Sequence, residues 1–469
     1  LTLEWVGLFP GKRESRRFNG LYTLTQQDVI NQSTHYDAVA YGGWAIDLHP
    51  ADGVYAGGNG CHQWHSKGVY QIPYRCYVTP DLDNLFVGGR IISSSHVANG
   101  TTRVMCTSAL GGEVIGRAAS ICLSKGYKPI DLVDRDRIGL LQSLLVKNGN
   151  FIPGIAVAVE DNLADSAEIS VSSVLELDDL PADGTWFGLD YPIAQLIPVN
   201  GKVPVVRMNV KADNATRLVM ELRSSSKSEN YTPDTIDAVL EFDLKKDENE
   251  IVADFSYSYA TPRYAFICLM KNPEISVPMS GRLVTGLTAV YNYINPAVSN
   301  FGKQVPPEGI GVEEFEFWCP KRRPESKNIA MSFAPPLASF NSENLRNSYY
   351  RPYIGTNAWV AAFDDARPEV CFKWNGRKQI KTIILYFDTD TDQAMETVQM
   401  GHFDACVPTC YREYIVRDSV GKELYHITGN HQTLNVLELD QPVTTDAIYV
   451  NFVRPCGDVC PGLMGVYVC

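Results

Sequence analysis

The chain of 469 residues lacks any long hydrophobic run and any excess of basic residues. No apolar segment reaches the roughly 20 residues that a membrane-spanning helix requires. Lys and Arg number 41 against 54 Asp and Glu, which gives a formal net charge of -13. Because phosphate contacts need concentrated Lys and Arg, this balance argues against a general nucleic-acid binder. We therefore expect no membrane span and no nucleic-acid partner.

Closely spaced cysteine pairs are also missing, although the chain has 12 cysteines. The C-terminal region has two CxxxC pairs and a terminal cysteine: Cys406 and Cys410, Cys456 and Cys460, and Cys469. Four-thiolate zinc sites favour tighter CxxC pairs, so thiols or disulfides fit these spacings better. His62 and His65 lie beside Cys61, but no carboxylate cluster completes a metal site. We expect no metal, and disulfides would suit an exported protein.

The most informative stretch of the sequence is residues 84–119. An apolar run ending in Gly88, Gly89 and Arg90 precedes a polar connection and a long segment with helical periodicity, which predicts strand, loop and helix. The helix should begin near Val104 and is rich in small residues: Thr107, Ser108, Ala109, Gly111, Gly112, Gly116, Ala118 and Ala119. Glycine inside a helix costs about 1 kcal/mol relative to alanine, so a close backbone approach is expected there.

Two explanations of that close approach stay open. A flat, anionic cofactor would be attracted to the N–H groups and dipole at the helix N-terminus, which Arg90 and Arg103 bracket. Alternatively, the small residues let the helix pack tightly on a sheet.

Several motifs of this region resemble those of a known family. NLFVGGR, SSSH and RVMCTSALGGEVIGRAA resemble the C-terminal flavin-binding segment of FAD-dependent oxidoreductases related to the fumarate reductase and succinate dehydrogenase flavoproteins. GKRESRRFNGLYTLTQQDV, GGWAIDLHP and YQIPYRCYVTP are similar to a bacterial branch of that group, and the resemblance covers roughly residues 1–150. It implies FAD as the cofactor, contacted by Arg13, Glu14, Gly88, Gly89, Arg90, Thr107, Ser108, Ala109, Leu110, Gly111 and Gly112. Without the resemblance, the basic run around Arg13 is a solvated surface.

The sequence departs from this family at its beginning. Such proteins start with a βαβ unit that carries G-x-G-x-x-G and binds the pyrophosphate, and this chain has no such unit. GGNG at 57–60 lies in a polar stretch and predicts a turn. We expect the N-terminal half of the flavin domain on a separate or cleaved chain, or missing from this sequence. A remnant that no longer binds flavin is the third alternative.

Histidines are the candidates for proton transfer. Residues 36–80 are rich in Gly, Tyr, Trp and His, which predicts a loop-dominated cap over a site. Oxidation of an alcohol needs a base for the hydroxyl proton while hydride leaves for the flavin, and histidine titrates in the useful range. His96, followed by Arg103, resembles a family pair that contacts a substrate carboxylate, and His49 is a further catalytic candidate. Because VANGTT differs from the family pattern, a dicarboxylate substrate is not implied, and His96 could instead only hydrogen-bond the loop or the flavin.

Beyond the flavin-related part, the pattern becomes all-β. A second helix is predicted from Asp134 to Gly149, and the first domain should span 1–159. Short alternating apolar runs then predict a β-sandwich at 166–312 and another at 318–469, the latter resembling a galactose-binding-like (discoidin-type) jelly roll. SAEISVSS and NIAMSFAPPLASF are candidates for the opening strands of the two sandwiches. The predicted fold class is therefore an incomplete α/β flavin domain followed by two all-β domains.

Two functions remain. The first is an FAD-dependent oxidoreductase that transfers hydride between flavin and a hydroxylated or carbohydrate-derived substrate, with sandwiches that bind glycan or organise a homo-oligomer. The second is a non-catalytic secreted or surface protein that interacts with carbohydrate and retains part of a flavin fold. Either function is expected in the periplasm or outside the cell, with the cytoplasm as the alternative location.

Overall fold

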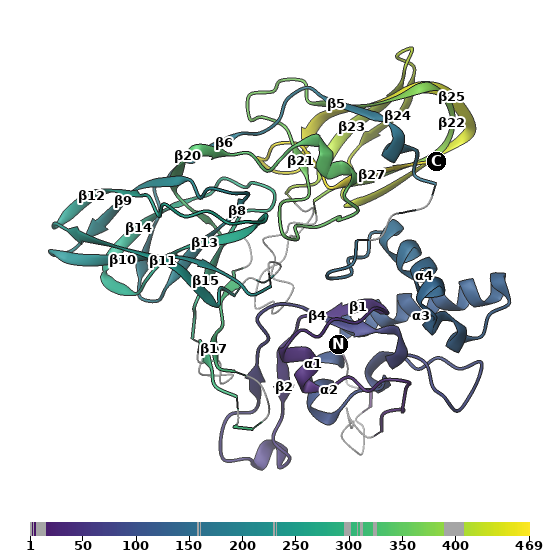
Figure 1. The fold of residues 1–469 in the computed structure, drawn as a ribbon, viewed down its shortest axis with the longest axis horizontal. Coiled ribbons are helices and arrows are strands. Elements are labelled where there is room, and N and C mark those ends of the chain that lie inside the picture. The colour runs from purple at the N-terminus through teal and green to yellow at the C-terminus, as the bar shows by residue number, and fades with distance from the viewer. Residues whose placement is uncertain are drawn as a thin grey trace.

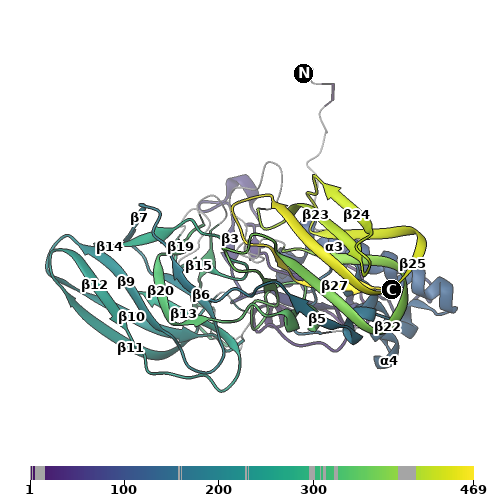
Figure 2. The same cartoon turned by 90° about the horizontal axis from the view of Figure 1, so that it is seen from above.

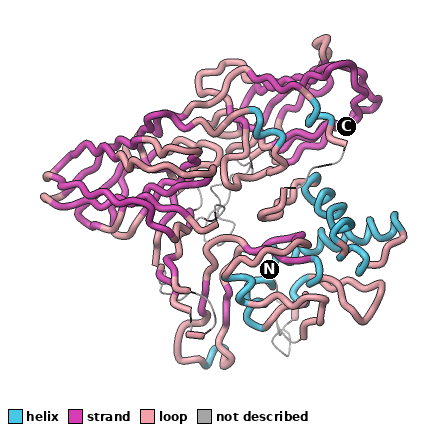
Figure 3. The backbone as a smooth tube through the Cα atoms, in the orientation of Figure 1, coloured by secondary structure: helices cyan, strands magenta, loops and turns pink. Residues whose placement is uncertain are grey.

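The computed structural model describes residues 2, 4–5, 16–156, 159, 161–227, 230, 232–294, 302–306, 308–309, 313–321, 326–388 and 408–469. The chain forms a helix-containing N-terminal part and two β-sandwiches (Figure 1). Almost all of the helical residues lie in the N-terminal part, as Figure 3 shows by colour. The predicted order of a partly helical flavin-related region followed by two all-β domains is confirmed.

The N-terminal part combines helices with two short antiparallel sheets. Its helices are α1 (Gln26–Ile30), α2 (His96–Thr102), α3 (Met105–Lys125) and α4 (Arg135–Lys147). Its strands are β1 (Ala38–Gly42), β2 (Ile46–Leu48), β3 (His62–Trp64) and β4 (Tyr70–Pro73), with β1 paired to β4 and β2 to β3. The region expected to be a loop-dominated cap therefore also contains four strands.

Each of the two long helices has a capping residue at one terminus. The Asp134 carboxylate accepts hydrogen bonds from the backbone N–H groups of Asp136 and Arg137, which caps α4. Gly126 ends α3 with φ of 69°, a left-handed conformation that glycine adopts without steric cost. On α4, Ile138 and Leu141 are buried, as the predicted apolar face requires.

The first sandwich consists of two antiparallel sheets. One has the order β11 (Thr235–Leu244), β10 (Thr216–Ser224), β13 (Arg263–Leu269), β8 (Ile193–Val199), β15 (Thr288–Tyr291) and β18 (Cys319–Pro320). The other contains β19 (Asn328–Ile329), β14 (Asn272–Ser280), β9 (Val205–Ala212), β20 (Met331–Leu337), β6 (Leu177–Leu180), β12 (Asp247–Ala253) and β7 (Trp186–Leu189). Burial alternates along β9, as expected for a strand with one face on the core.

The last sandwich is built around two long, bent strands, β22 (Glu369–Tyr386) and β25 (Leu434–Pro455). The strands around them are β5 (Glu168–Val171), β21 (Trp359–Val360), β23 (Tyr411–Asp418), β24 (Glu423–Thr428), β26 (Gly462–Leu463) and β27 (Gly465–Val468). A separate hydrophobic core, which includes Trp359 and Phe372, fills this sandwich. Figure 2 shows the two sandwiches side by side along the long axis of the molecule.

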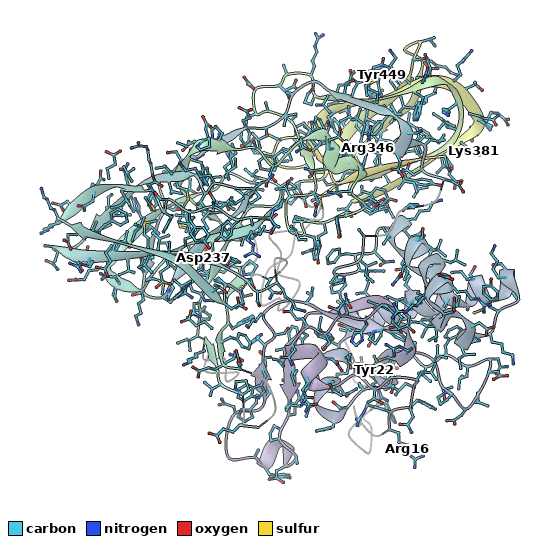
Figure 4. The ribbon with its side chains drawn as sticks, viewed as in Figure 1. Arg16, Tyr22, Asp237, Arg346, Lys381 and Tyr449 are labelled. Atoms are coloured by element: carbon cyan, nitrogen blue, oxygen red, sulfur yellow. The ribbon has the colours of Figure 1, made fainter. Side chains whose placement is uncertain are left out.

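Strand pairing does not follow the domain boundaries expected at 166 and 318. The segment SAEISVSS forms β5, which pairs with β22 and so belongs to the last sandwich. The segment NIAMSFAPPLASF forms β19 and β20, which pair with β14 and β9 of the first sandwich. Each segment thus completes the other domain, because an edge strand is recruited by register and side-chain fit rather than by its order in the chain. Arg346, labelled in Figure 4, donates to the carbonyl of Ala167 just before β5.

An arm of the first sandwich reaches the N-terminal part. It contains the paired strands β16 (Lys303–Gln304) and β17 (Phe315–Glu316), and Figure 1 shows β17 leading toward β2. The backbone N–H of His65 donates to the side-chain oxygen of Gln304 at 3.2 Å. The His65 ring stacks on Phe317, with the ring centroids 3.9 Å apart. Within the described part of the chain, no helix is both long and apolar enough to cross a membrane.

Because His65 is buried, we expect the stability of the protein to decrease in acid. Burial lowers the pKa of His65 from its ordinary 6.5 to about 3, so the folded protein keeps the ring neutral. The unfolded chain takes up a proton below about pH 6.5, so stability should fall as the pH drops from about 6.5 toward 3.

We expect His65→Phe, which preserves a stacking ring, to reduce this loss by up to ~1.4 kcal/mol per pH unit within that window. Urea unfolding of both proteins at several pH values measures the slopes. Equal slopes would mean that His65 does not titrate differently in the folded and unfolded states.

Candidate functional site

The N-terminus of α3 begins where predicted and has no side-chain cap. Val104 is the N-cap residue and provides no side-chain hydrogen bond to the first turn. Met105, the first helical residue, is 87% exposed. A 21-residue helix therefore presents unsatisfied backbone N–H groups and the positive end of its dipole at an accessible position.

The small residues of α3 divide between two faces. A Cβ atom added to Gly111 would lie 2.8 Å from the ring of Tyr77, so this glycine permits a close approach to the interior. Nothing lies within 4 Å of a Cβ added to Gly112 or Gly116. The packing explanation therefore applies to the face that carries Gly111, whereas the cofactor explanation stays a prediction for the open face that carries Gly112 and Gly116.

The predicted flavin contacts on α3 follow the same division. Thr107 and Gly111 are buried, whereas Ala109 and Gly112 are exposed. Ser108 and Leu110 are partly buried. Of the predicted flavin contacts on α3, only Ala109 and Gly112 lie on the accessible face near the helix N-terminus.

The glycine pair before α2 forms a turn rather than the end of a strand. The predicted strand at 84–87 is wrong, because the chain makes only an isolated bridge between Val78 and Phe86 there. Gly89 has φ of 65° and begins a 3₁₀ turn, Gly89–Ile91, in which Arg90 is exposed. A Cβ on Gly88 would lie 2.5 Å from Ile115 of α3, so this glycine lets the turn lie directly against the helix.

The segment expected to be a polar loop is the helix α2. Ser95 caps it by accepting from the N–H of Ala98 at 3.2 Å, an N-cap signal that reveals the helix in retrospect. His96 is the first helical residue and is exposed, and Arg103 is the C-cap residue. The two lie about 10 Å apart along the helix axis.

Asp47 of β2 is the residue that brings two of the candidates together. Arg103 donates through Nη2 to the backbone carbonyl of Asp47 at 3.0 Å and lies 3.7 Å from its Oδ2. His49 Nε2 lies 3.3 Å from the same Oδ2, and His49 Nδ1 lies 3.0 Å from the carbonyl oxygen of Gly60. Both ring nitrogens of His49 therefore face oxygen acceptors, so a ring that takes up a proton finds an acceptor for each N–H.

Sequence analysis gave Asp47 no function. The signal that identifies it is the period of two along a strand, which puts residues 47 and 49 on one side. The Asp47 side chain is only 15% exposed, and its Oδ1 atom is buried without a hydrogen-bond partner. Burial and the nearby Asp47 carboxylate raise the pKa of the Cys61 thiol.

Several other buried polar atoms of the N-terminal part have no partner among the described residues. They include Trp44 Nε1, Ser94 Oγ, Thr102 Oγ1 and Ser108 Oγ. Thr102 is next to Arg103, and Ser108 lies in the first turns of α3. An unsatisfied buried polar group costs free energy, so each of these atoms lowers the stability of the fold unless a partner satisfies it.

Some predicted residues lie outside this description or remain untested. Arg13 and Glu14 lie outside the described residues. Within the described residues, no three His, Cys, Asp or Glu side chains gather in a way that could hold a metal ion.

Comparison with known proteins supports the flavin relationship for the N-terminal part. Residues 1–145 match the family model described as FAD dependent oxidoreductase. No protein of curated function matches the chain. The N-terminal part is thus similar to FAD-dependent oxidoreductases, and this match spans the Gly88–Arg90 turn, α2 and α3.

Similar solved structures are carbohydrate-binding β-sandwich modules. A chitosan-binding module of a chitosanase/glucanase from Paenibacillus sp. IK-5 is 10% identical, with a TM-score of 0.21, and covers 28% of this chain and 86% of its own. The family 32 module of Streptococcus pneumoniae EndoD has 10% identity, a TM-score of 0.22 and coverages of 28% and 86%. The family 32 module of Clostridium perfringens NanJ, solved with galactose, has 11% identity, a TM-score of 0.19 and coverages of 28% and 83%. TM-scores this low say nothing about a ligand of this chain.

The two faces of α3 predict opposite effects for the same substitution. Gly116→Ala should stabilise the protein by up to ~1 kcal/mol, because alanine is the better helix former and the added methyl group meets open space. Gly111→Ala should destabilise it by ~1–3 kcal/mol, because the methyl group collides with the buried ring of Tyr77. Urea unfolding measures both changes. A stabilising Gly111→Ala would contradict the close approach.

Proposed function

We propose that this protein is an FAD-dependent oxidoreductase that transfers hydride between flavin and a hydroxylated, carbohydrate-derived substrate. The observation that carries the proposal is the uncapped, accessible N-terminus of α3, a helix against which the Gly88–Arg90 turn also packs at Ile115. This geometry occurs within the residues that match the FAD dependent oxidoreductase family model. Backbone N–H groups at a helix N-terminus are suited to an electron-rich ring edge or a phosphate.

The chain's own residues divide the binding of FAD among them. The first N–H groups of α3 would donate to the cofactor, and Ser108 Oγ would gain the partner it lacks in the described structure. Ala109 and Gly112 would provide a surface without bulky side chains. Contacts from Gly89 and Arg90, whose turn packs against α3, and from Arg13 and Glu14 stay predictions.

Proton transfer is assigned to the pair His49 and Asp47. A bound flavin would supply the hydride acceptor for alcohol oxidation. His49, whose side chain is 40% exposed, would take the substrate's hydroxyl proton on Nδ1 after the hydroxyl replaces the Gly60 carbonyl at that nitrogen, while Nε2–H donates to Asp47. Arg103 would act as a positioning residue, since it holds Asp47 through both the carbonyl and the carboxylate. His96, at the exposed start of α2, stays a second candidate for the base.

The β-sandwiches would bind carbohydrate or organise a homo-oligomer outside the cytoplasm. This part rests on their fold and on the sequence resemblance of the last sandwich to galactose-binding-like domains. A partner chain that completes the flavin domain also stays part of the proposal. A non-catalytic carbohydrate-interaction protein is the alternative if flavin does not bind.

The assignment of the base is tested by single-turnover reduction of the bound flavin. His49→Gln should slow reduction by about a hundredfold, because general-base catalysis typically contributes a factor of this size or more. His62→Gln, an exposed histidine on the neighbouring strand, is the matched control and should leave the rate unchanged. Hydroxylated sugars and sugar acids serve as trial substrates, and unchanged flavin absorbance confirms that cofactor binding is intact.

A larger loss with His96→Gln than with His49→Gln would transfer the role to His96. Asp47→Asn should lower the rate and also shift its pH profile, because it alters the partner of the His49 ring. A slower rate with an unchanged profile would reduce Asp47 to a structural role.

A further inference from the structure

An apolar cavity lies between the N-terminal part and the arm of the first sandwich. Its volume is about 230 Å³. The N-terminal part contributes Ile46 and Leu48 from β2, Trp64 from β3 and Val97 from α2, and the arm contributes Phe315. Ligand sites commonly lie at such junctions between domains. The cavity is not used by the proposed flavin chemistry.

The cavity is partly open to solvent, and its lining carries no charge. None of its lining residues is exposed, and none is Asp, Glu, Lys or Arg. His65, which also lines it, is neutral near pH 7, because burial lowers its pKa to about 3. The Gln304 side chain already accepts from the His65 N–H, so the walls offer little to a charged ligand. A charged group would lose hydration and find only neutral side chains, among them the amides of Gln26 and Gln304, as polar partners.

The strand β2 separates this cavity from the polar site. Ile46 and Leu48 line the cavity, whereas Asp47 between them contacts Arg103 and His49. This division follows from the alternation of side chains along a strand. A Cβ added to Gly100 of α2 would lie 3.1 Å from the Asp47 N–H nitrogen, so helix and strand are in close contact here. A ligand in the cavity would therefore press on the strand that carries the proposed base.

We propose that this cavity binds a small, uncharged hydrophobic molecule that consists of one aromatic or aliphatic ring with small substituents. An apolar cavity of about 150 Å³ suffices for benzene, so a volume of this size accommodates a ring with one or two small substituents. The ligand contacts β2, β3 and α2 on one side and Phe315 of the arm on the other. Its binding fastens the arm to the N-terminal part, and this inference is independent of whether flavin binds.

Toluene is the probe for thermal unfolding of the full chain. At tenfold excess over its dissociation constant, toluene should raise the unfolding midpoint by about 2 °C or more, because it binds only the folded state. Val97→Phe fills the cavity and should abolish the shift. Val239→Phe, on the exposed edge of β11, is the matched control and should retain it. A shift that persists unchanged in Val97→Phe would overturn the proposal.

Quenching of Trp64 gives a second readout that does not depend on the folding of Val97→Phe. Bromobenzene should quench part of the tryptophan fluorescence in a saturable manner, because its heavy atom would contact Trp64 in the cavity. Trp64→Phe should remove the saturable component. Absence of saturable quenching, or equal quenching in Trp64→Phe, would show that the probe does not bind at this cavity.

Discussion

The close approach of α3 to Tyr77 is the constraint on which the candidate site depends. Gly111 allows the helix to lie against the buried Tyr77 ring, and Gly88 allows the preceding turn to lie against Ile115 of the same helix. These two contacts fix the position of the uncapped helix N-terminus relative to the Gly89–Arg90 turn. Because a methyl group at either glycine would collide with a neighbour, the local sequence is determined by packing before any ligand is considered.

The short strand β2 connects the two functional inferences. On one side it carries Asp47, which Arg103 holds in place and which contacts His49. On the other side, Ile46 and Leu48 face an uncharged cavity that the arm closes. The polar and apolar features therefore depend on one element of three residues, whose own pairing is limited to β3. Anchoring by α2 and by the arm compensates for the short pairing.

Strong local signals predicted much of the fold, whereas long-range pairing could not be predicted. The start of α3 near Val104 and the cap of α4 at Asp134 follow from periodicity and capping chemistry. The helix α2 was missed because Gly100 and four β-branched or Asn residues mask its period, although Ser95 is a good N-cap. The exchange of β5 and β20 between sandwiches depends on register with distant strands. In the site, the period of two along a strand relates Asp47 to His49, whereas the contact of Asp47 with Arg103 depends on the packing of α2 against β2, which no sequence spacing reveals.

The most direct test of the account is the absorbance spectrum of the protein purified from its own source. We expect the near-ultraviolet and visible bands of an oxidised flavin. These bands should be weaker in Ala109→Leu, because the variant places a bulky side chain beside the α3 N-terminus and should bind less flavin. Ala119→Leu, an equally exposed alanine about 15 Å further along the helix, should retain the wild-type flavin content. A colourless protein that gains no flavin after addition of FAD would contradict the account and favour the carbohydrate-interaction alternative.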